Sequence, residues 1–420
     1  MQSAYAKSNL RFALSLLGHA YDASLLSSDP DKKQVVQLSP FSIRRALTMA
    51  AIGSRGATRQ SILDAMCYPS GTDLAAVNAD NLAMANFLST CESRGDAPTT
   101  LLLANALWLR ENGDKNDPKF HQPFIDDNAR FFNAECNRLP FDDAALARIN
   151  KWCDTNTKGK ITKIIDEIPA DAFAFLTDAL YMKTPAKERF HHVNDKAGKF
   201  FGLGADGKLA ATGTDTTFMR QRGEFQYLAT DGVQVLQFPF GQYGHFNFYL
   251  VLPDLDSDLT SAIKGLRGNW SDWQDNLGPG FGMLRIAQNE QEWGKDVIPE
   301  LVLQGMGLAF TDNADFADMC DKPLKIGAVA HKTKTKFSHK GFEGAAVTAV
   351  GMIECTSIGM PVIRKQFDIT ANRPYAWLVT GGDEVLFAGT TVKPTAPVEQ
   401  DPNDFEGWDC QDDADLNTLR

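Results

Sequence analysis

The sequence predicts an α+β protein, with helices concentrated in the first half of the chain and antiparallel strands in the second half. Apolar residues recur at helical spacing in several early segments, and later segments form strand pairs joined by short turns. The sequence lacks the regular alternation of strand and helix that would indicate a parallel sheet. No internal repeat or linker divides the body of the chain. A single domain with large antiparallel sheets is therefore expected.

The expected helices have recognisable ends. Ser39 and Pro40 begin an apolar-periodic segment that Gly53 ends. Asp73 is placed to cap the next helix, and a later helix ends at Gly159. These signals predict at least three helices before the strand-rich half.

The expected strands are runs of β-branched and aromatic residues bounded by turn residues. One lies at 99–112, and two hairpins pair 234–240 with 245–253 and 375–379 with 384–392. Residues 331–337 alternate cleanly, which predicts a strand with His331 and Phe337 on the buried face. The three lysines between them would face solvent.

Composition narrows the class of protein. The chain has 420 residues, of which 43% are hydrophobic and 10% aromatic, so it is not disordered, collagenous or a coiled coil. No apolar run approaches the roughly 20 residues of a membrane helix. Asn9 and Arg11 interrupt the first segment, which reads as an amphipathic helix rather than a secretion signal.

Charge content argues against nucleic-acid and membrane partners, and cysteine content points to the cell interior. The formal net charge is −11, but eight carboxylates against Arg420 alone lie after Pro394, so we expect residues 395–420 to be an acidic, disordered tail. The body is then too weakly charged to recruit nucleic acid or anionic lipid. Seven scattered cysteines without a CxxC pair favour a reducing compartment. We expect a cytoplasmic protein, with leaderless export as the alternative.

No catalytic constellation stands out. Residues 202–207 match the dinucleotide pattern GxGxxG, but no convincing helix follows to receive a pyrophosphate. Thr356-Ser357 lacks the first glycine of a nucleophile elbow. His191 and His192 are adjacent and would point to opposite sides of a strand. We therefore expect no enzyme activity, no cofactor and no metal.

Several motifs, in order along the chain, resemble signatures of the serpin family. They lie at 38–43 with 53–58, 149–152 with 157–161, 303–316, 331–346, and 372–375 with 385–394. The resemblance runs from about Asn9 to Pro394. It implies one serpin domain at 1–394, with about eight to nine helices around three β-sheets and an exposed reactive-centre loop.

The resemblance also implies a mechanism. A target endopeptidase cleaves the exposed loop and is acylated by it, and the cut loop then inserts into the main sheet as a new strand. Insertion drags the protease along and distorts its active site, so the acyl-enzyme persists. The expected function is irreversible inhibition of a serine, alternatively a cysteine, endopeptidase.

The resemblance places the hinge of that loop after Gly341. The hinge residues are Gly341, Phe342, Glu343, Gly344, Ala345, Ala346, Val347 and Thr348. Alternate residues starting at Phe342 would face the core, and no proline interrupts the segment up to Met360. Inhibitory relatives usually have a small hydroxyl residue where Phe342 stands. A bulky leading residue could slow insertion, so a non-inhibitory binding, chaperone or storage role is the alternative.

Family spacing places the reactive bond between Cys355 and Thr356. The segment that follows is longer than usual, so Met352, Met360 and Arg364 remain alternative specificity residues. The sequence does not name the target protease. The helix expected at 73–91 carries no Lys or Arg, which argues against heparin-type activation, and we expect a monomer.

The resemblance further implies a polar gate that controls sheet opening, made of Ser39, Ser42, Asp178 and His331. Asp178 stands where the family usually has asparagine. An aspartate beside His331 would form a charge-assisted hydrogen bond and couple sheet opening to pH.

Overall fold

The computed structural model describes residues 4–92, 99–113, 115, 117–168, 172–187, 190–204, 208–230, 232–241, 243–339, 341–342 and 364–396. The described helices are α1 (Ala6–Leu25), α2 (Pro40–Ile52), α3 (Gly56–Ala65), α4 (Leu74–Thr90), α5 (Gln122–Phe132), α6 (Asp143–Asn156), α7 (Leu259–Asn276), α8 (Ile298–Leu303) and a short 3-10 helix at Gly307–Phe310. Five of them lie before residue 140, which confirms that helices are concentrated in the first half of the chain.

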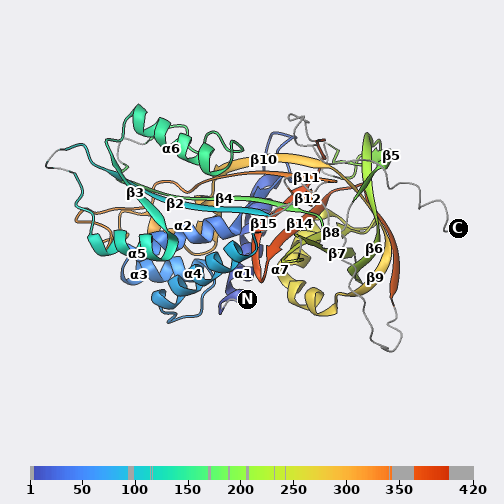
Figure 1. Ribbon diagram of the computed structural model, residues 1–420, viewed down its shortest axis with the longest axis horizontal. Coiled ribbons are helices and arrows are strands. Elements are labelled where there is room, and N and C mark those ends of the chain that lie inside the picture. The colour runs from blue at the N-terminus through green and yellow to red at the C-terminus, as the bar shows by residue number, and fades with distance from the viewer. Residues whose placement is uncertain are drawn as a thin grey trace.

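A six-stranded sheet extends across much of the molecule (Figure 1). Its order is β10 (Asn289–Asp296), β11 (Ala330–Ser338), β12 (Gly341–Phe342), β4 (Ala174–Pro185), β2 (Thr100–Arg110) and β3 (Ala134–Leu139). All neighbours are antiparallel except β2 and β3. Helix α6 lies on one face of this sheet and α2 on the other (Figure 1).

The second sheet has nine strands. They are β1 (Gln37–Leu38), β5 (His191–Phe200), β6 (Thr214–Thr230), β7 (Val233–Phe240), β8 (Phe246–Pro253), β9 (Gly278–Ala287), β13 (Lys365–Ala371), β14 (Tyr375–Gly381) and β15 (Glu384–Thr391). The long strand β6 pairs with β5 through its first residues, with β9 from Phe218 to Tyr227, and with β7 through its last five residues. Two of the three expected sheets are therefore joined by hydrogen bonds along one strand.

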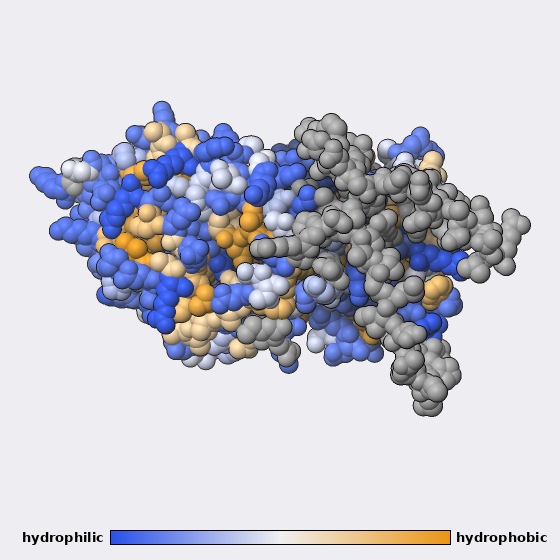
Figure 2. Space-filling view, in the orientation of Figure 1, coloured by the Kyte–Doolittle hydropathy of each residue, from blue (hydrophilic) through white to orange (hydrophobic). Residues whose placement is uncertain are grey.

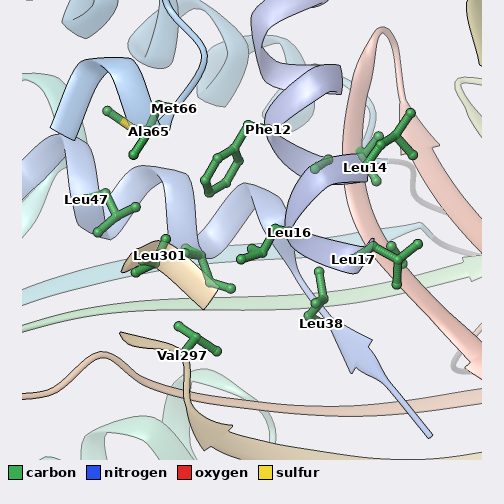
Figure 3. Close-up of a cluster of buried hydrophobic side chains, with 14 of the residues drawn as sticks. Phe12, Leu14, Leu16, Leu17, Leu38, Leu47, Ala65, Met66, Val297 and Leu301 are labelled. Carbon is green, nitrogen blue, oxygen red and sulfur yellow. The ribbon is translucent and has the colours of Figure 1, made fainter. Parts of the chain in front are cut away.

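The core lies where the helices pack against the two sheets. Figure 3 shows part of it, with Phe12 and Leu16 of α1 facing Leu47 of α2 and Leu301 of α8. A second cluster, rich in phenylalanine, lies between the sheets. On the surface shown in Figure 2, hydrophobic residues gather in patches over the half that holds α3, α4 and α5.

Strand β11 confirms the predicted alternation. His331, Thr333, Thr335 and Phe337 are buried. The lysines on the opposite face are more covered than expected, because Lys332 and Lys334 pair with glutamates of β10 and their side chains are about one third exposed. The lysine face of β11 is therefore partly open to solvent rather than fully open.

Candidate functional site

A slot separates β4 from β11 in the six-stranded sheet. Strand β12 lies between them at one end, where Phe342 pairs with Phe337 on one side and with Thr184 on the other. Among the described residues, no other strand fills the space between β4 and β11. A cavity of about 60 Å³ continues the slot, between Asp178–Met182 on β4 and Ala330–Lys336 on β11. The described residues therefore place the start of a strand at this position.

Phe342 fills the end of the slot where β12 lies. Its side chain is 2% exposed, and its ring centroid lies 5.4 Å from that of Phe387 and 6.3 Å from that of Trp377. Gly341 has φ +130°, and a Cβ there would lie 2.5 Å from the Thr184 carbonyl oxygen. Only glycine fits this approach to β4, and it positions Phe342 in its aromatic seat. The bulk of Phe342 is thus accommodated in the intact chain.

Ser39 connects α2 with β15 and β11 through three hydrogen bonds. Its side chain caps α2 by accepting a hydrogen bond from the Ser42 amide at 3.3 Å, and it donates to the Leu386 carbonyl at 2.7 Å. Its backbone N–H donates to Nε2 of His331 at 3.0 Å. Burial lowers the pKa of His331 to about 3, so the ring is a neutral acceptor at neutral pH.

Asp178 does not pair with His331, so the expected partner is wrong. Its Oδ2 accepts a hydrogen bond from Nε of Arg45 at 2.9 Å, and both side chains are 1% exposed. Burial raises the pKa of Asp178, while the charge of Arg45 and the hydroxyl of Ser42 oppose that rise. An arginine on α2 lies within reach of the carboxylate, whereas the imidazole is already committed to Ser39 as a neutral acceptor.

The remaining predicted site residues fall into two groups. Arg364, one alternative specificity residue, lies just before β13 and forms an ion pair with Glu224 of β6 at 2.6 Å. The others lie outside the described residues: Glu343, Gly344, Ala345, Ala346, Val347, Thr348, Met352, Cys355, Thr356 and Met360. The acidic segment 397–420 also lies outside them.

Two buried arginines were missed as functional candidates. Arg44 and Arg45 are neighbours on α2, and each forms a buried ion pair, with Glu384 on β15 and with Asp178 on β4. The helix is predicted from its apolar periodicity alone, which gives the two arginines no role. The available signal was the pair of arginines itself, since two adjacent charges in an otherwise apolar helix need buried counter-ions.

The family model described as serpin (serine protease inhibitor) matches residues 7–394. The chain belongs to the serpin family. Serpin-ZX of Arabidopsis thaliana is 26% identical over 389 residues, covering 86% of this chain and 92% of that protein.

Solved serpin structures share the fold of this serpin. The native state of the thermophilic serpin tengpin superposes with a TM-score of 0.76 at 22% identity, covering 94% of this chain and 95% of tengpin. Thyroxine-binding globulin, solved in complex with thyroxine, gives a TM-score of 0.74 at 21% identity, covering 93% of this chain and all of that one. The shared fold thus includes both a serpin crystallised in its native state and a protein solved in complex with thyroxine.

Two structural features bear on other functions. In the part of the chain that the structure describes, no helix combines the length and apolarity needed to cross a bilayer. Across the same residues, no group of three or more His, Cys, Asp or Glu side chains could hold a metal ion.

Proposed function

We propose that this serpin is an irreversible, suicide-substrate inhibitor of a serine, alternatively a cysteine, endopeptidase. The observation that carries the proposal is the position of β12 between β11 and β4. The residue that leads the loop already pairs with both strands that would flank an inserted loop. Beyond it, no other described strand lies between β4 and β11, and a new strand there could pair with both.

The chemistry follows from the reactive bond. The protease nucleophile attacks the carbonyl carbon of Cys355, the bond to Thr356 breaks, and the new amino group of Thr356 leaves with a proton. The acyl-enzyme would be hydrolysed by water if the loop stayed outside. Insertion competes with that hydrolysis, and a difference of about 1.4 kcal/mol between the two barriers changes their ratio tenfold.

The seat of Phe342 supports insertion on equilibrium grounds. Burying a phenylalanine side chain stabilises by roughly 1.5–3 kcal/mol, and here the ring lies among Trp377, Phe387 and the start of the slot. The same seat favours the second candidate, a non-inhibitory binding, chaperone or storage protein. A hinge held by aromatic contacts could leave the rest of the loop too slow to outrun deacylation.

The proposal includes a cellular setting. The five described cysteines are free thiols, which supports a reducing compartment and hence the cytoplasm. We propose a monomer without nucleic-acid, membrane or heparin partners. Helix α4, where the absence of Lys and Arg argues against heparin, spans Leu74–Thr90.

The experiment is a search for protease complexes that survive SDS. The full chain is incubated with serine and cysteine endopeptidases, and a covalent band at the summed mass supports the proposal. Mass spectrometry of the released C-terminal peptide identifies the reactive bond, since a peptide starting at Thr356 distinguishes it from cleavage after Met352, Met360 or Arg364. Cleavage without any complex would favour the non-inhibitory role.

A matched pair of variants tests whether insertion causes the trapping. Thr348→Arg places a charge at a predicted core-facing position of the inserting loop, whereas Val347→Arg places it at the neighbouring solvent-facing position. We expect Thr348→Arg to convert the inhibitor into a substrate, and Val347→Arg to keep forming complexes. Equal behaviour of the two variants would contradict strand insertion in this register.

A further inference from the structure

A second, larger cavity lies at the end of the slot opposite Phe342. It has a volume of about 520 Å³ and is bounded by α2, by the first half of β4 and by the segment 323–331, and we call it the lower cavity. Ile43, Leu47 and Ala50 of α2 contribute apolar walls, as does Phe175 of β4. Cavities of this size and composition hold small organic molecules in other proteins.

One end of the lower cavity is polar and incompletely satisfied. Asp178, whose side chain is 1% exposed, lines it together with Ser42 and His331. Oδ2 of Asp178 accepts the hydrogen bond from Arg45, and the nearby Ser42 hydroxyl lowers the pKa of the carboxyl, but Oδ1 is buried and has no partner within hydrogen-bond geometry among the described residues. Buried carboxylate oxygens are normally hydrogen-bonded, so an orphan acceptor at the end of an apolar cavity is a position for a ligand donor.

The charges around the cavity select a neutral ligand. Asp178 is already balanced by Arg45, and Lys325, which also lines the cavity, pairs with Asp312 at 2.6 Å. A charged molecule would therefore bring an uncompensated charge between apolar walls. A hydroxyl group supplies the missing donor without adding charge.

We propose that the lower cavity is a binding site for a neutral, largely apolar ring compound whose hydroxyl group donates a hydrogen bond to Oδ1 of Asp178. The site is separate from the hinge seat of Phe342, which lies at the other end of the slot. The proposal does not require the chain to inhibit a protease. If it does inhibit, a bound molecule lies between β4 and the segment leading into β11, in the path of the inserting loop.

The test is a calorimetric titration of the intact full chain with two matched probes. 4-Phenylphenol carries the hydroxyl donor, and 4-methoxybiphenyl has the same ring system with that donor methylated. We expect the phenol to bind about tenfold more tightly, as a hydrogen bond to a charged acceptor implies. Equal affinities, or no binding of either probe, would overturn the proposal.

Three variants locate the binding. In Arg45→Met/Asp178→Leu the buried pair is replaced by apolar side chains, and we expect the two probes to bind equally. Ala46→Phe fills the lower cavity from α2 and should abolish binding of both probes, and Ala46→Leu serves if phenylalanine prevents folding. Asp215→Asn, which removes an exposed carboxylate from its pair with Lys199, is the control and should keep the tenfold preference. A preference that survives in the double variant, or binding that survives a filled cavity, would place the probes elsewhere and contradict the site.

Discussion

Arg44 and Arg45 are consecutive residues of α2, yet they hold the helix to two different sheets in two different ways. Arg44 faces β15 of the nine-stranded sheet, where it forms two hydrogen bonds to the Glu384 carboxylate at 3.0 and 3.3 Å. Its Nη1 donates to Tyr68 at 3.2 Å and to Asn81 at 3.0 Å. Burial alone would lower the pKa of Arg44, but attraction to Glu384 and Tyr68 raises it above its ordinary value.

Arg45 faces β4 of the six-stranded sheet with a single hydrogen bond to Asp178. The rest of its guanidinium lies over the rings of Phe41 and Phe132, and its Nη1 is buried without a hydrogen-bond partner among the described residues. Here burial outweighs the attraction of Asp178 and lowers the pKa of Arg45. The comparison indicates that α2 is fixed firmly to one sheet and loosely to the other, and the loose side is the one that borders the slot.

The largest expected effect comes from removing the firm attachment. Arg44→Met/Glu384→Leu should lower the free energy of unfolding by about 3–5 kcal/mol, because Nδ2 of Asn9 and Oδ1 of Asn81 would each lose a buried hydrogen bond. Urea unfolding measures the loss. A change of less than about 1 kcal/mol would mean that the network has the weight of a surface ion pair.

The matching replacement on the loose side should have the opposite sign. Arg45→Met/Asp178→Leu removes a pair whose desolvation is poorly repaid, so we expect the free energy of unfolding to be unchanged or to rise by up to about 1–4 kcal/mol. The same urea titration is used, with the Arg44/Glu384 variant alongside. If both double variants lose equal stability, the contrast between the two sides of α2 is wrong.

The buried His331 predicts that the free energy of unfolding depends on pH. The pKa of His331 is about 3 in the folded chain and near its ordinary 6.5 in the unfolded chain. Between these values the unfolded chain binds the extra proton, so stability is lost as the pH falls from 6.5 toward 3, by up to about 1.4 kcal/mol per pH unit. The raised pKa of Asp178 acts with the opposite sign, so the comparison must isolate His331.

His331→Gln provides that comparison, because its amide oxygen can accept from Ser39 but cannot titrate. Unfolding is measured at pH 6.5, 5.5 and 4.5 for both proteins, and we expect the variant to have the shallower slope. Parallel slopes would show that His331 contributes nothing to acid sensitivity.

The smallest expected effect concerns the hinge. Phe342→Leu keeps an apolar side chain in the aromatic seat, so it should reduce the free energy of unfolding by less than about 1.5 kcal/mol. If bulk limits the rate of insertion, the same variant should form more complex per cleavage event with a target protease. A loss of stability above about 3 kcal/mol would instead identify Phe342 as a structural anchor.

Features formed by residues close together in the sequence could be predicted, whereas features formed by residues far apart in the sequence could not. The alternation in β11 and the Ser39 cap of α2 are written in neighbouring residues, and both are present. The partner of Asp178 is 133 residues away on another element, so inspection of the sequence could not choose Arg45 over His331. The lower cavity was equally inaccessible, since its walls come from four separate segments of the chain, at 42–50, 164–165, 172–178 and 312–331.

The two-residue strand β12 could not be predicted from a sequence pattern. Its burial follows from Gly341 and from the rings around Phe342, not from any periodicity, and a short segment at a hinge carries no strand signal of its own. The resemblance to serpins predicted that Phe342 would lead the loop and cast doubt on its size. The structure supplies the seat that receives it.

Inhibition by the proposed mechanism requires that the rest of the loop can insert between β4 and β11. Thermal unfolding tests this insertion most directly. The intact chain is compared with chain nicked near Cys355 by a permissive protease, without any target present. We expect the cut protein to melt tens of degrees higher, because a full strand then fills the sheet. An unchanged melting temperature would contradict insertion and leave a binding or storage role for this serpin.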